Sequence, residues 1–596
     1  MVLLAPAGVA QVRPAQRVNV LGLNDSGGNQ ADGIGVATRG SRFAMVWAEQ
    51  LGTSAGTQDI HFSVSDDFGL TWSPQVRIDT GDGPNASDSD EPKVVITGDG
   101  TIVAVWEDVK DARSFGTDNE DLFYNRSSDG GATWLSPSLP LNTPTSGAHA
   151  SSDVDRISIA ADGDRICVVW EEDSLAGAGG AEEIWFTRST DAGATWTAPR
   201  IVTSTTTIVD ADDPKVAVRG SNVVIGFIDD GGWDDDVYAL GSTDFGTTFT
   251  KVLVESATTG DVDDPQLAMD GDLVALVWQD ADAGGASDGL HGVVSQDGGR
   301  TWRAETVLAP RVQATPGARV SWAVVAVRDP DVYVVYTEDS ESVAGGGPGG
   351  LTKLYASVSN SRGGSWTFDV PLDAADGRRD NRPAVAVGDA YVVVCSETGA
   401  AGANGLGFTY SGDHGATWSP LHAVPGVGPD VDSEDLHEGT YFVTSASGDL
   451  ALAGFWDRPT GTNELYASAI EVGSVTRYCP TTPNSTGAPA VLDSLGTTYY
   501  AANDFGLRAS GLPDHPGIFL LGRTAISLPY ADGYICLGGV RFLRPPLLAL
   551  GGVAERTVDL PSDGVLLGTN TFQYWYRDPG FGVSNNLSDA LEVTFR

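Results

Sequence analysis

The chain has 596 residues, of which 80 are acidic and 35 are basic, so its formal net charge is −45. This charge excludes a general nucleic-acid binder, which needs a basic surface to neutralise phosphates, and it argues against docking on anionic lipid. Hydrophobic residues make up 41% of the chain and charged residues only 19%, which excludes disorder throughout. The 75 glycines and 31 prolines favour a β-rich chain with many turns.

Residues 1–11 are predicted to be the remnant of a leader or a disordered N-terminal tail. Met1 to Ala10 reads MVLLAPAGVA, an apolar stretch that ends in small residues, and it resembles the end of a secretory signal peptide. No later apolar run reaches the roughly 20 residues that a transmembrane helix needs. We therefore expect a secreted or cell-surface protein without a transmembrane segment.

A short pattern recurs along residues 12–474. It begins as SVSDDFGLTW and returns at spacings of 52 to 64 residues, and its last residue is always aromatic: Trp72, Trp134, Trp196, Phe249, Trp302, Trp366 and Trp418. An apolar run such as IVAVWED precedes each copy, and an opening run such as PKVVITG stands before that. These runs are rich in β-branched residues, which favours strands. Four short strands per repeat at this spacing predict a β-propeller.

The blade count follows from the two ends of the repeats. An eighth unit, Asp432 to Val472, has the first three strands but lacks the recurring pattern. At the other end, Gln16 to Leu23 has the character of a fourth strand without a unit. Pairing the two would close the ring and remove its exposed edges. We predict an all-β chain with an eight-bladed propeller closed by this N-terminal strand, and seven blades are the alternative.

The pattern S-x-D-x-G-x-T-W resembles the Asp-box, or bacterial neuraminidase repeat, of the sialidase superfamily. The resemblance implies that each copy is the turn between the third and fourth strands of a blade, where Asp and Ser bond backbone groups and Trp packs between strands. The box aspartates, for which a structural role is expected, are Asp129, Asp191, Asp244, Asp297 and Asp413. The first box offers Asp66 or Asp67, and the sixth has Ser361 or Arg362 instead.

Sialidases of that superfamily have six blades, an early Arg-Ile-Pro motif and three arginines that grip the substrate carboxylate. This chain lacks Arg-Ile-Pro, and no catalytic residue is assigned. Arginines do stand where several first strands begin, and we treat four of them as candidate ligand-binding residues: Arg156, Arg319, Arg379 and Arg382. Converging guanidinium groups could hold a carboxylate or a sulfate. The alternative is that each arginine neutralises a neighbouring aspartate.

Acidic strings connect one unit to the next. They read DSDEPKV, DVDRI, DADDPKV, DVDDPQL and DVDSEDL, and in a propeller they emerge on one face. Oxygen-only clusters suit Ca²⁺, which accepts six to eight hard ligands. The candidate ligands are Asp90, Asp155, Asp210, Asp212, Asp213, Asp261, Asp263, Asp264 and Asp432. The alternative is that these aspartates cap turns and keep the protein soluble.

The repeat stops beyond Val475, and residues 475–596 are predicted to form a small β-sandwich with strands at GIFLLGRT, YICLGGVRFL and TFQYWYRD. The strings RYCPTTPNSTGAP and ICLGGVRFLR resemble a C-terminal module of secreted proteins from planctomycetes and myxobacteria. Cys479 and Cys536 are predicted to form a disulfide, as suits an oxidising compartment. The aromatic run from Tyr574 to Tyr576 is a carbohydrate platform or part of the core.

Together these features predict a non-catalytic protein that binds a glycan or an extracellular protein through an acidic, calcium-bearing face. One alternative is an exo-sialidase-like glycoside hydrolase that acts on acidic sugars. A second alternative is a structural surface protein. No nucleic-acid partner is expected, and no oligomeric state is predicted.

Overall fold

The computed structural model describes two compact units. The repeat domain is Pro14–Ser468, and the C-terminal domain consists of Met1–Arg13 with Ala469–Arg596. The described residues are 8–12, 15–19, 33–49, 57–69, 71–84, 86–109, 120–142, 154–173, 182–203, 210–230, 235–255, 262–281, 288–313, 318–339, 352–372, 379–388, 391–400, 403–424, 442–447, 450–457, 464–495, 498, 500, 503, 505–580, 582 and 584–595.

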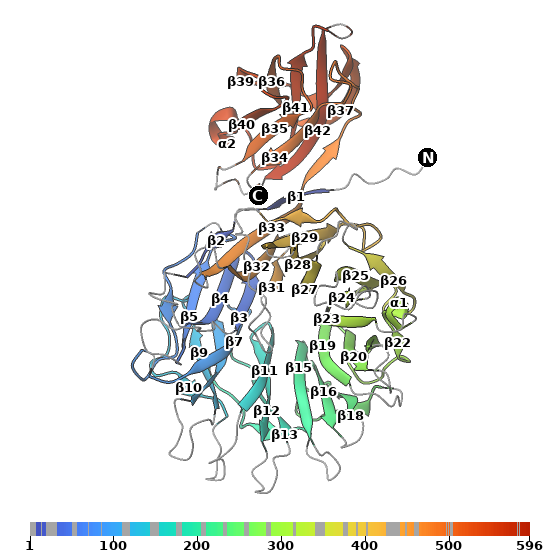
Figure 1. The fold of residues 1–596 in the computed structure, drawn as a ribbon. Helices are drawn as coiled ribbons and strands as arrows, with labels where there is room; N and C mark the ends of the chain where they lie inside the picture. Colours follow the sequence, from blue (N-terminus) through green and yellow to red (C-terminus); the bar gives the residue numbers. More distant parts are fainter. Residues whose placement is uncertain are drawn as a thin grey trace. The chain divides into compact units, whose positions relative to one another are not determined.

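The repeat domain is a series of antiparallel sheets (Figure 1). The first four sheets contain β3 (Ile34–Arg39), β4 (Arg42–Glu49), β5 (Asp59–Ser65) and β6 (Val76–Arg77); β7 (Ser89–Ile96), β8 (Ile102–Asp108), β9 (Asp121–Ser127) and β10 (Leu139–Pro140); β11 (Val154–Asp162), β12 (Arg165–Asp173), β13 (Glu182–Ser189) and β14 (Arg200–Ile201); and β15 (Ala211–Arg219), β16 (Asn222–Asp230), β17 (Asp235–Ser242) and β18 (Thr250–Leu253). In each sheet the strands lie in sequence order. This confirms the prediction of repeats of four short antiparallel strands.

The next three groups of four strands repeat this arrangement, and we count them as the fifth to seventh sheets, although one parallel pairing, Asp288 with Arg319, joins the first two of them. They contain β19 (Val262–Asp270), β20 (Leu273–Ala281), β21 (Asp288–Ser295) and β22 (Thr306–Val307); β23 (Arg319–Arg328), β24 (Asp331–Asp339), β25 (Lys353–Ser359) and β26 (Thr367–Pro371); and β27 (Arg379–Val387), β28 (Val392–Ala400), β29 (Ala403–Ser411) and β30 (His422–Ala423). A short helix, α1 (Pro310–Gln313), lies between β22 and β23. Among the described residues the repeat domain is therefore almost entirely β.

The last sheet draws on both ends of the repeat domain. Its strands are β31 (Phe442–Ser447), β32 (Leu450–Asp457), β33 (Glu464–Tyr478) and β2 (Gln16–Arg17). β2 pairs antiparallel with β33, with Gln16 opposite Ala467, and the amide of Val18 donates to the carbonyl of Leu465 at 2.8 Å. A segment from the start of the domain thus supplies the fourth strand at its end.

The first strand of each sheet contacts the first strand of the next. The order is β3, β7, β11, β15, β19, β23, β27 and β31, and β31 in turn contacts β3. Figure 1 shows these strands facing the middle of the domain. The hydrophobic clusters accordingly lie between consecutive sheets: one of them joins Val46 and Phe62 of the first sheet to Val94, Trp106 and Phe123 of the second.

The recurring turns form one hydrogen-bonded structure. In the second sheet Asp129 Oδ1 accepts the amide of Thr133 at 2.9 Å, its Oδ2 accepts the Thr133 hydroxyl at 2.6 Å, and Ser127 Oγ accepts the amide of Gly131 at 2.8 Å. These bonds, the first of them from Thr133, lower the pKa of Asp129 to about 2. Trp134 packs on Phe62 of the preceding sheet, with ring centroids 4.8 Å apart. The same carboxylate contacts recur at Asp67, Asp191, Asp244, Asp297 and Asp413.

Two uncertain boxes are thereby assigned. Asp67 is the box residue of the first turn, because Ser65 Oγ donates to it at 2.7 Å, whereas Asp66 forms an ion pair with Arg42 at 2.6 Å. In the sixth turn Ser361 takes the aspartate position, and its Oγ accepts the amide of Ser365 at 2.8 Å. The Ser361 hydroxyl also bonds the Ser365 hydroxyl at 2.8 Å, so this serine contacts the same two groups of residue 365 that a box aspartate contacts in the other turns.

The C-terminal domain is also built from strands. They are β1 (Gly8–Val12), β34 (Val491–Leu495), β35 (Gly506–Ser510), β36 (Pro516–Gly522), β37 (Thr524–Tyr530), β38 (Gly533–Gly538), β39 (Arg541–Leu548), β40 (Ala554–Thr557), β41 (Gly568–Arg577) and β42 (Asn585–Phe595), with one short helix, α2 (Leu560–Asp563). One sheet follows the order β33, β42, β41, β36 and β39, and another follows β34, β35 and β40. β1, from the segment predicted as a leader or tail, pairs with β33, with Gly8 opposite Thr476.

The two sheets share one core. Leu492 and Leu507 of the smaller sheet pack in the same cluster as Phe572 and Leu591 of the larger one. Tyr574 and Tyr576 are fully buried, so these two rings belong to the core and form no carbohydrate platform. Cys479 and Cys536 form a disulfide with their Cα atoms 6.0 Å apart. Cys167 and Cys395, in the repeat domain, are buried free thiols.

Candidate functional site

The first strands of six sheets share a bulge near their start. In the fourth sheet, for example, the pairing register shifts between Asp212 and Lys215, as it does between Asp155 and Ser158 in the third. Each bulge holds a non-glycine residue with a positive φ, namely Glu91 (44°), Arg156 (57°), Asp213 (52°), Asp264 (49°), Trp322 (54°) and Arg382 (50°). Such residues cost of order 1–3 kcal/mol each and cluster at functional sites, and bulges re-aim side chains. The repeated bulge therefore marks this end of the first strands.

A pocket of about 690 Å³ lies at these bulges, which we call the acidic pocket. It is lined by Asp155, Arg156, Glu171, Glu182, Asp212, Asp213, Ile228, Asp235, Val262, Asp263, Gln279 and Arg319. The lining residues come from the third to the sixth sheets, so the pocket is a product of several repeats. Among the described lining residues, carboxylates outnumber guanidinium groups and none is aromatic.

Six residues predicted from the sequence meet in the acidic pocket: Arg156, Arg319, Asp155, Asp212, Asp213 and Asp263. Asp210 lies beside it, where its Oδ1 accepts the amide of Glu182 at 2.6 Å. Asp264 accepts a hydrogen bond from the side chain of Gln279. Asp90 lies elsewhere, in the second sheet. Asp261, Asp432 and the side chain of Arg379 lie outside the described residues.

Three acids in the pocket form a compact group, here called the pocket cluster. Glu171 on β12, Glu182 on β13 and Asp212 on β15 each place a carboxylate oxygen within 4.8 Å of the others. Burial raises the pKa of Glu171 to about 7. A hydrogen bond with Glu171, followed by burial, raises the pKa of Glu182 to about 8. Burial and the bond to Glu182 raise the pKa of Asp212 to about 8. Carboxylates this close need protons or a cation between them.

The sequence reasoning did not single out Glu182. It opens the third strand of its sheet, and it lies opposite Asp173, the last residue of the second strand. The sequence does contain a feature that could have indicated Glu182. Two acids, Glu182 and Glu183, begin the third strand, and acids also end the second strand with which it pairs. Only the strand register brings Glu182 to the same end as Asp212.

Among the described residues, the candidate arginines have different surroundings. Arg156 forms ion pairs with Asp213 at 3.2 Å and Asp155 at 4.0 Å. Arg382 does not line the acidic pocket, and its guanidinium stacks over the ring of Trp322 at 4.8 Å. Of the arginines described, two line the pocket, Arg156 and Arg319. Trp322 occupies the bulge position of its strand and is 39% exposed.

The two acids at the end of a second strand have different roles. The acid two residues after the tryptophan accepts a bond from the indole: Trp47 donates to Glu49 at 2.9 Å, and Trp170 donates to Glu172 at 2.7 Å. The first acid of the pair, Glu171 in the third sheet, points to the pocket instead. Because successive side chains of a strand point to opposite faces, neighbouring acids separate into structural and pocket residues.

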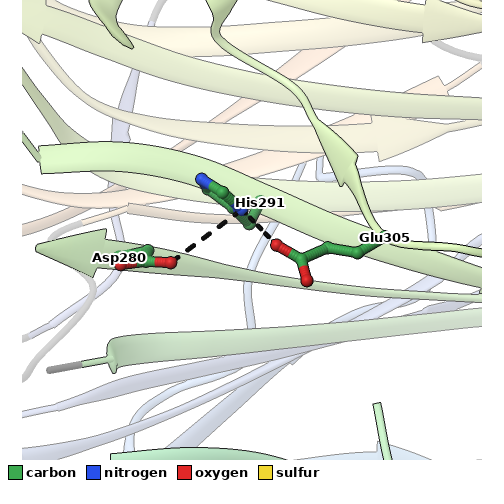
Figure 2. A group of neighbouring side chains, drawn as sticks. All are labelled: Asp280, His291 and Glu305. Atoms are coloured by element: carbon green, nitrogen blue, oxygen red, sulfur yellow. Dashed lines mark hydrogen bonds and ion pairs between the residues drawn. The ribbon is translucent and has the colours of Figure 1, made fainter. Parts of the chain in front are cut away.

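Apart from the pocket cluster, a group of polar side chains lies inside the fifth sheet (Figure 2). Figure 2 shows His291 between Asp280 and Glu305, with dashed lines from its ring to both carboxylates. His291 Nδ1 is hydrogen-bonded to Glu305 and lies 3.9 Å from Asp280. Burial is the largest influence on the pKa of His291 and lowers it, but the bond to Glu305 and the nearby negative charges outweigh burial and raise the pKa. These three residues could hold a metal ion. The contact between His291 and Glu305 also fits a buried ion pair.

Comparisons with known proteins complete this description. No protein-family model matches the chain, and no curated protein matches it. Among solved structures, a Hadza microbial sialidase is 17% identical, covers 51% of this chain and 63% of its own length, and has a TM-score of 0.34. NanB sialidase from Streptococcus pneumoniae is 13% identical over 65% of this chain and 67% of its own, with a TM-score of 0.32. An ulvan lyase is 12% identical, the match covers 78% of this chain and 94% of the lyase, and the TM-score is 0.38.

These similarities carry no argument about the function of this chain, because identities and scores are both low. The chain spans less than two thirds of the Hadza sialidase. Among the described residues no helix has the length and apolar character needed to cross a membrane. The function must therefore be argued from the site itself.

Proposed function

We propose that this chain is a non-catalytic binding protein that takes up Ca²⁺ in its acidic pocket and holds a glycan there. The observation that carries the proposal is the pocket cluster, in which oxygens of Glu171, Glu182 and Asp212 lie within 4.8 Å of one another in a pocket of about 690 Å³. Two oxygens bound to one Ca²⁺ ion lie at most about 5 Å apart, given bonds of about 2.3–2.6 Å. The cluster meets this condition without rearrangement.

The proposed scaffold is an eight-bladed propeller closed by β2. Its support is the cyclic order of contacts between first strands, which ends with β31 against β3, and the pairing of β2 with β33. A closed ring gathers the bulges of successive first strands at one end. This explains why one pocket draws its lining from four consecutive sheets.

A glycan is the ligand class that this chemistry favours. Calcium with open coordination positions binds pairs of sugar hydroxyls, because it prefers hard oxygen ligands. Arg319 adds a guanidinium that can bind a carboxylate or sulfate substituent. Trp322, at the equivalent bulge of β23, lies outside the described pocket lining, with the Arg382 guanidinium over its ring. The disulfide between Cys479 and Cys536 supports a secreted or cell-surface location for this activity.

The alternative of a sialidase-like hydrolase has weaker support. That chemistry requires three arginines around one carboxylate, whereas the described lining of the acidic pocket has two, and Arg156 is already ion-paired with Asp213. A binding role requires no such triad. The structural-protein alternative has no specific observation in its favour.

A glycan array in the presence of Ca²⁺ and of EDTA, run beside a fluorogenic sialoside assay, tests the proposal. We expect glycan binding only with Ca²⁺, loss of binding in Asp212→Asn, and no sialoside turnover. Asp263→Asn is the matched control, because Asp263 lines the pocket outside the pocket cluster. Turnover that disappears in Arg319→Ala, or binding that is indifferent to EDTA, would overturn the proposal.

A further inference from the structure

A second group of carboxylates lies one sheet before the acidic pocket. It consists of Asp90 on β7, Glu107 on β8 and Glu120, which directly precedes β9, and we call it the second-sheet cluster. One carboxylate oxygen from each residue lies within 4.8 Å of the others. None of the three residues lines the acidic pocket, so this is a separate place in the repeat domain.

Glu107 is the unusual member of this cluster. It is only 3% exposed, and its Oε1 atom is buried without a hydrogen-bond partner among the described residues. The next residue, Asp108, is satisfied differently, because it accepts the indole N–H of Trp106 at 3.2 Å. A buried carboxylate oxygen without a partner costs several kcal/mol unless something compensates it.

Among the described residues, the charges that most affect Glu107 are all negative. Besides burial, the charged groups that shift its pKa are Glu91, Asp90, Asp155 and Glu120, and all of them raise it. The nearby ammonium of Lys93 is paired with Glu91 at 3.6 Å. Among the described residues the cluster is thus lined by oxygens and carries excess negative charge.

Two members of the second-sheet cluster, Glu107 and Glu120, have the strand positions of Glu171 and Glu182 in the pocket cluster. The third members differ, because Asp90 lies on the first strand of the same sheet and Asp212 on the first strand of the next one. Glu107 lies opposite Asp90 in the second sheet, just as Glu171 lies opposite Asp155 in the third. The strands that begin at Asp121 and Glu182 pair with the same part of the second strand in each sheet. Two successive repeats have therefore placed acids at matching points, which is what a repeated ligand site requires.

We propose that Asp90, Glu107 and Glu120 bind a divalent cation of the calcium type, with the unpartnered oxygen of Glu107 as a central ligand. The oxygen-only donors and their mutual distances suit Ca²⁺. The carbonyl of Glu120 accepts the amide of Val154 at 3.1 Å, so an ion at Glu120 also fixes the start of β11 in the next sheet. This site is structural, and it is independent of any glycan held in the acidic pocket.

Calorimetric titration of the EDTA-treated full chain with CaCl₂ tests the site by counting ions. Glu107→Gln keeps the shape of the side chain and removes its charge, and Glu171→Gln is the matched change in the pocket cluster. We expect wild type to bind one more ion per chain than Glu107→Gln, while Glu171→Gln keeps the second-sheet ion. We also expect Ca²⁺ to raise the melting temperature of wild type by more than that of Glu107→Gln.

The outcomes separate this proposal from the proposed function. If the pocket binds no calcium, wild type binds one ion, which Glu107→Gln removes and Glu171→Gln does not. If Glu107→Gln and wild type bind the same number of ions with the same thermal shift, the second-sheet site is wrong and Glu107 is buried as a neutral acid. Should Glu107→Gln fail to fold, Asp90→Asn and Glu120→Gln must each remove the same ion, and their failure to do so refutes the site.

Discussion

Replacing Glu305 by Gln should change the pKa of His291 from raised to lowered, relative to its ordinary value of 6.5. The first sheet contains the natural comparison: His61 lies opposite Trp47 as His291 lies opposite Trp278, and Gln75 occupies the strand position of Glu305. Burial, with a smaller contribution from Arg77, lowers the pKa of His61 to about 4. In the fifth sheet the bond to Glu305 and the charge of Asp280 outweigh burial and raise the pKa of His291 above 6.5.

The magnitude follows from this comparison. Without the Glu305 carboxylate, burial should dominate and the pKa of His291 should fall below 6.5, toward the value of about 4 that His61 has. The interval from 6.5 to about 4, at about 1.4 kcal/mol per pKa unit, corresponds to roughly 3 kcal/mol. In wild type, His291 contributes stability below pH 6.5 that is lost as the pH rises through its raised pKa. In Glu305→Gln, the contribution is present above 6.5 and is lost as the pH falls toward 4.

Imidazole NMR titration of both proteins measures the two pKa values directly, and urea denaturation from pH 5 to pH 8 measures their effect on stability. Gln75→Glu is the reciprocal control, and it should raise the pKa of His61. A pKa of His291 that stays above 6.5 in Glu305→Gln would show that Glu305 is not the deciding partner.

Other substitutions test the recurring turns and the C-terminal domain. Ser127→Ala removes the acceptor of a buried amide and should cost about 1–3 kcal/mol in urea denaturation, whereas Ala at the exposed neighbour Ser128 should cost almost nothing. Ser361→Asp restores the missing carboxylate of the sixth turn and should add about 0.5–1.5 kcal/mol; a lower melting temperature would contradict this assignment. Replacing both Cys479 and Cys536 by Ala should cost about 2–5 kcal/mol, and an unchanged urea midpoint would exclude a stabilising disulfide.

The sequence by itself determined the repeated architecture. Strands such as IVAVWED are short and rich in β-branched residues, and each turn carries its own Ser and Asp, so these elements depend on contacts within a few residues. The same local pattern identified the sixth turn as one without its aspartate, at Ser361 or Arg362. The acidic strings before the first strands also revealed where several residues of the acidic pocket gather, including Asp155, Asp212 and Asp213.

Only the tertiary structure decided what individual acids do. Glu171 lines the pocket while Glu172 accepts a bond from Trp170, because neighbouring side chains of a strand point to opposite faces. Arg156 meets Asp213 from the next sheet, a contact that spacing along the chain does not reveal. His61 and His291 have similar local sequences but opposite pKa shifts, because the deciding groups come from the adjacent strand. Burial and charge are set by residues distant in sequence, so the properties of each site belong to the fold.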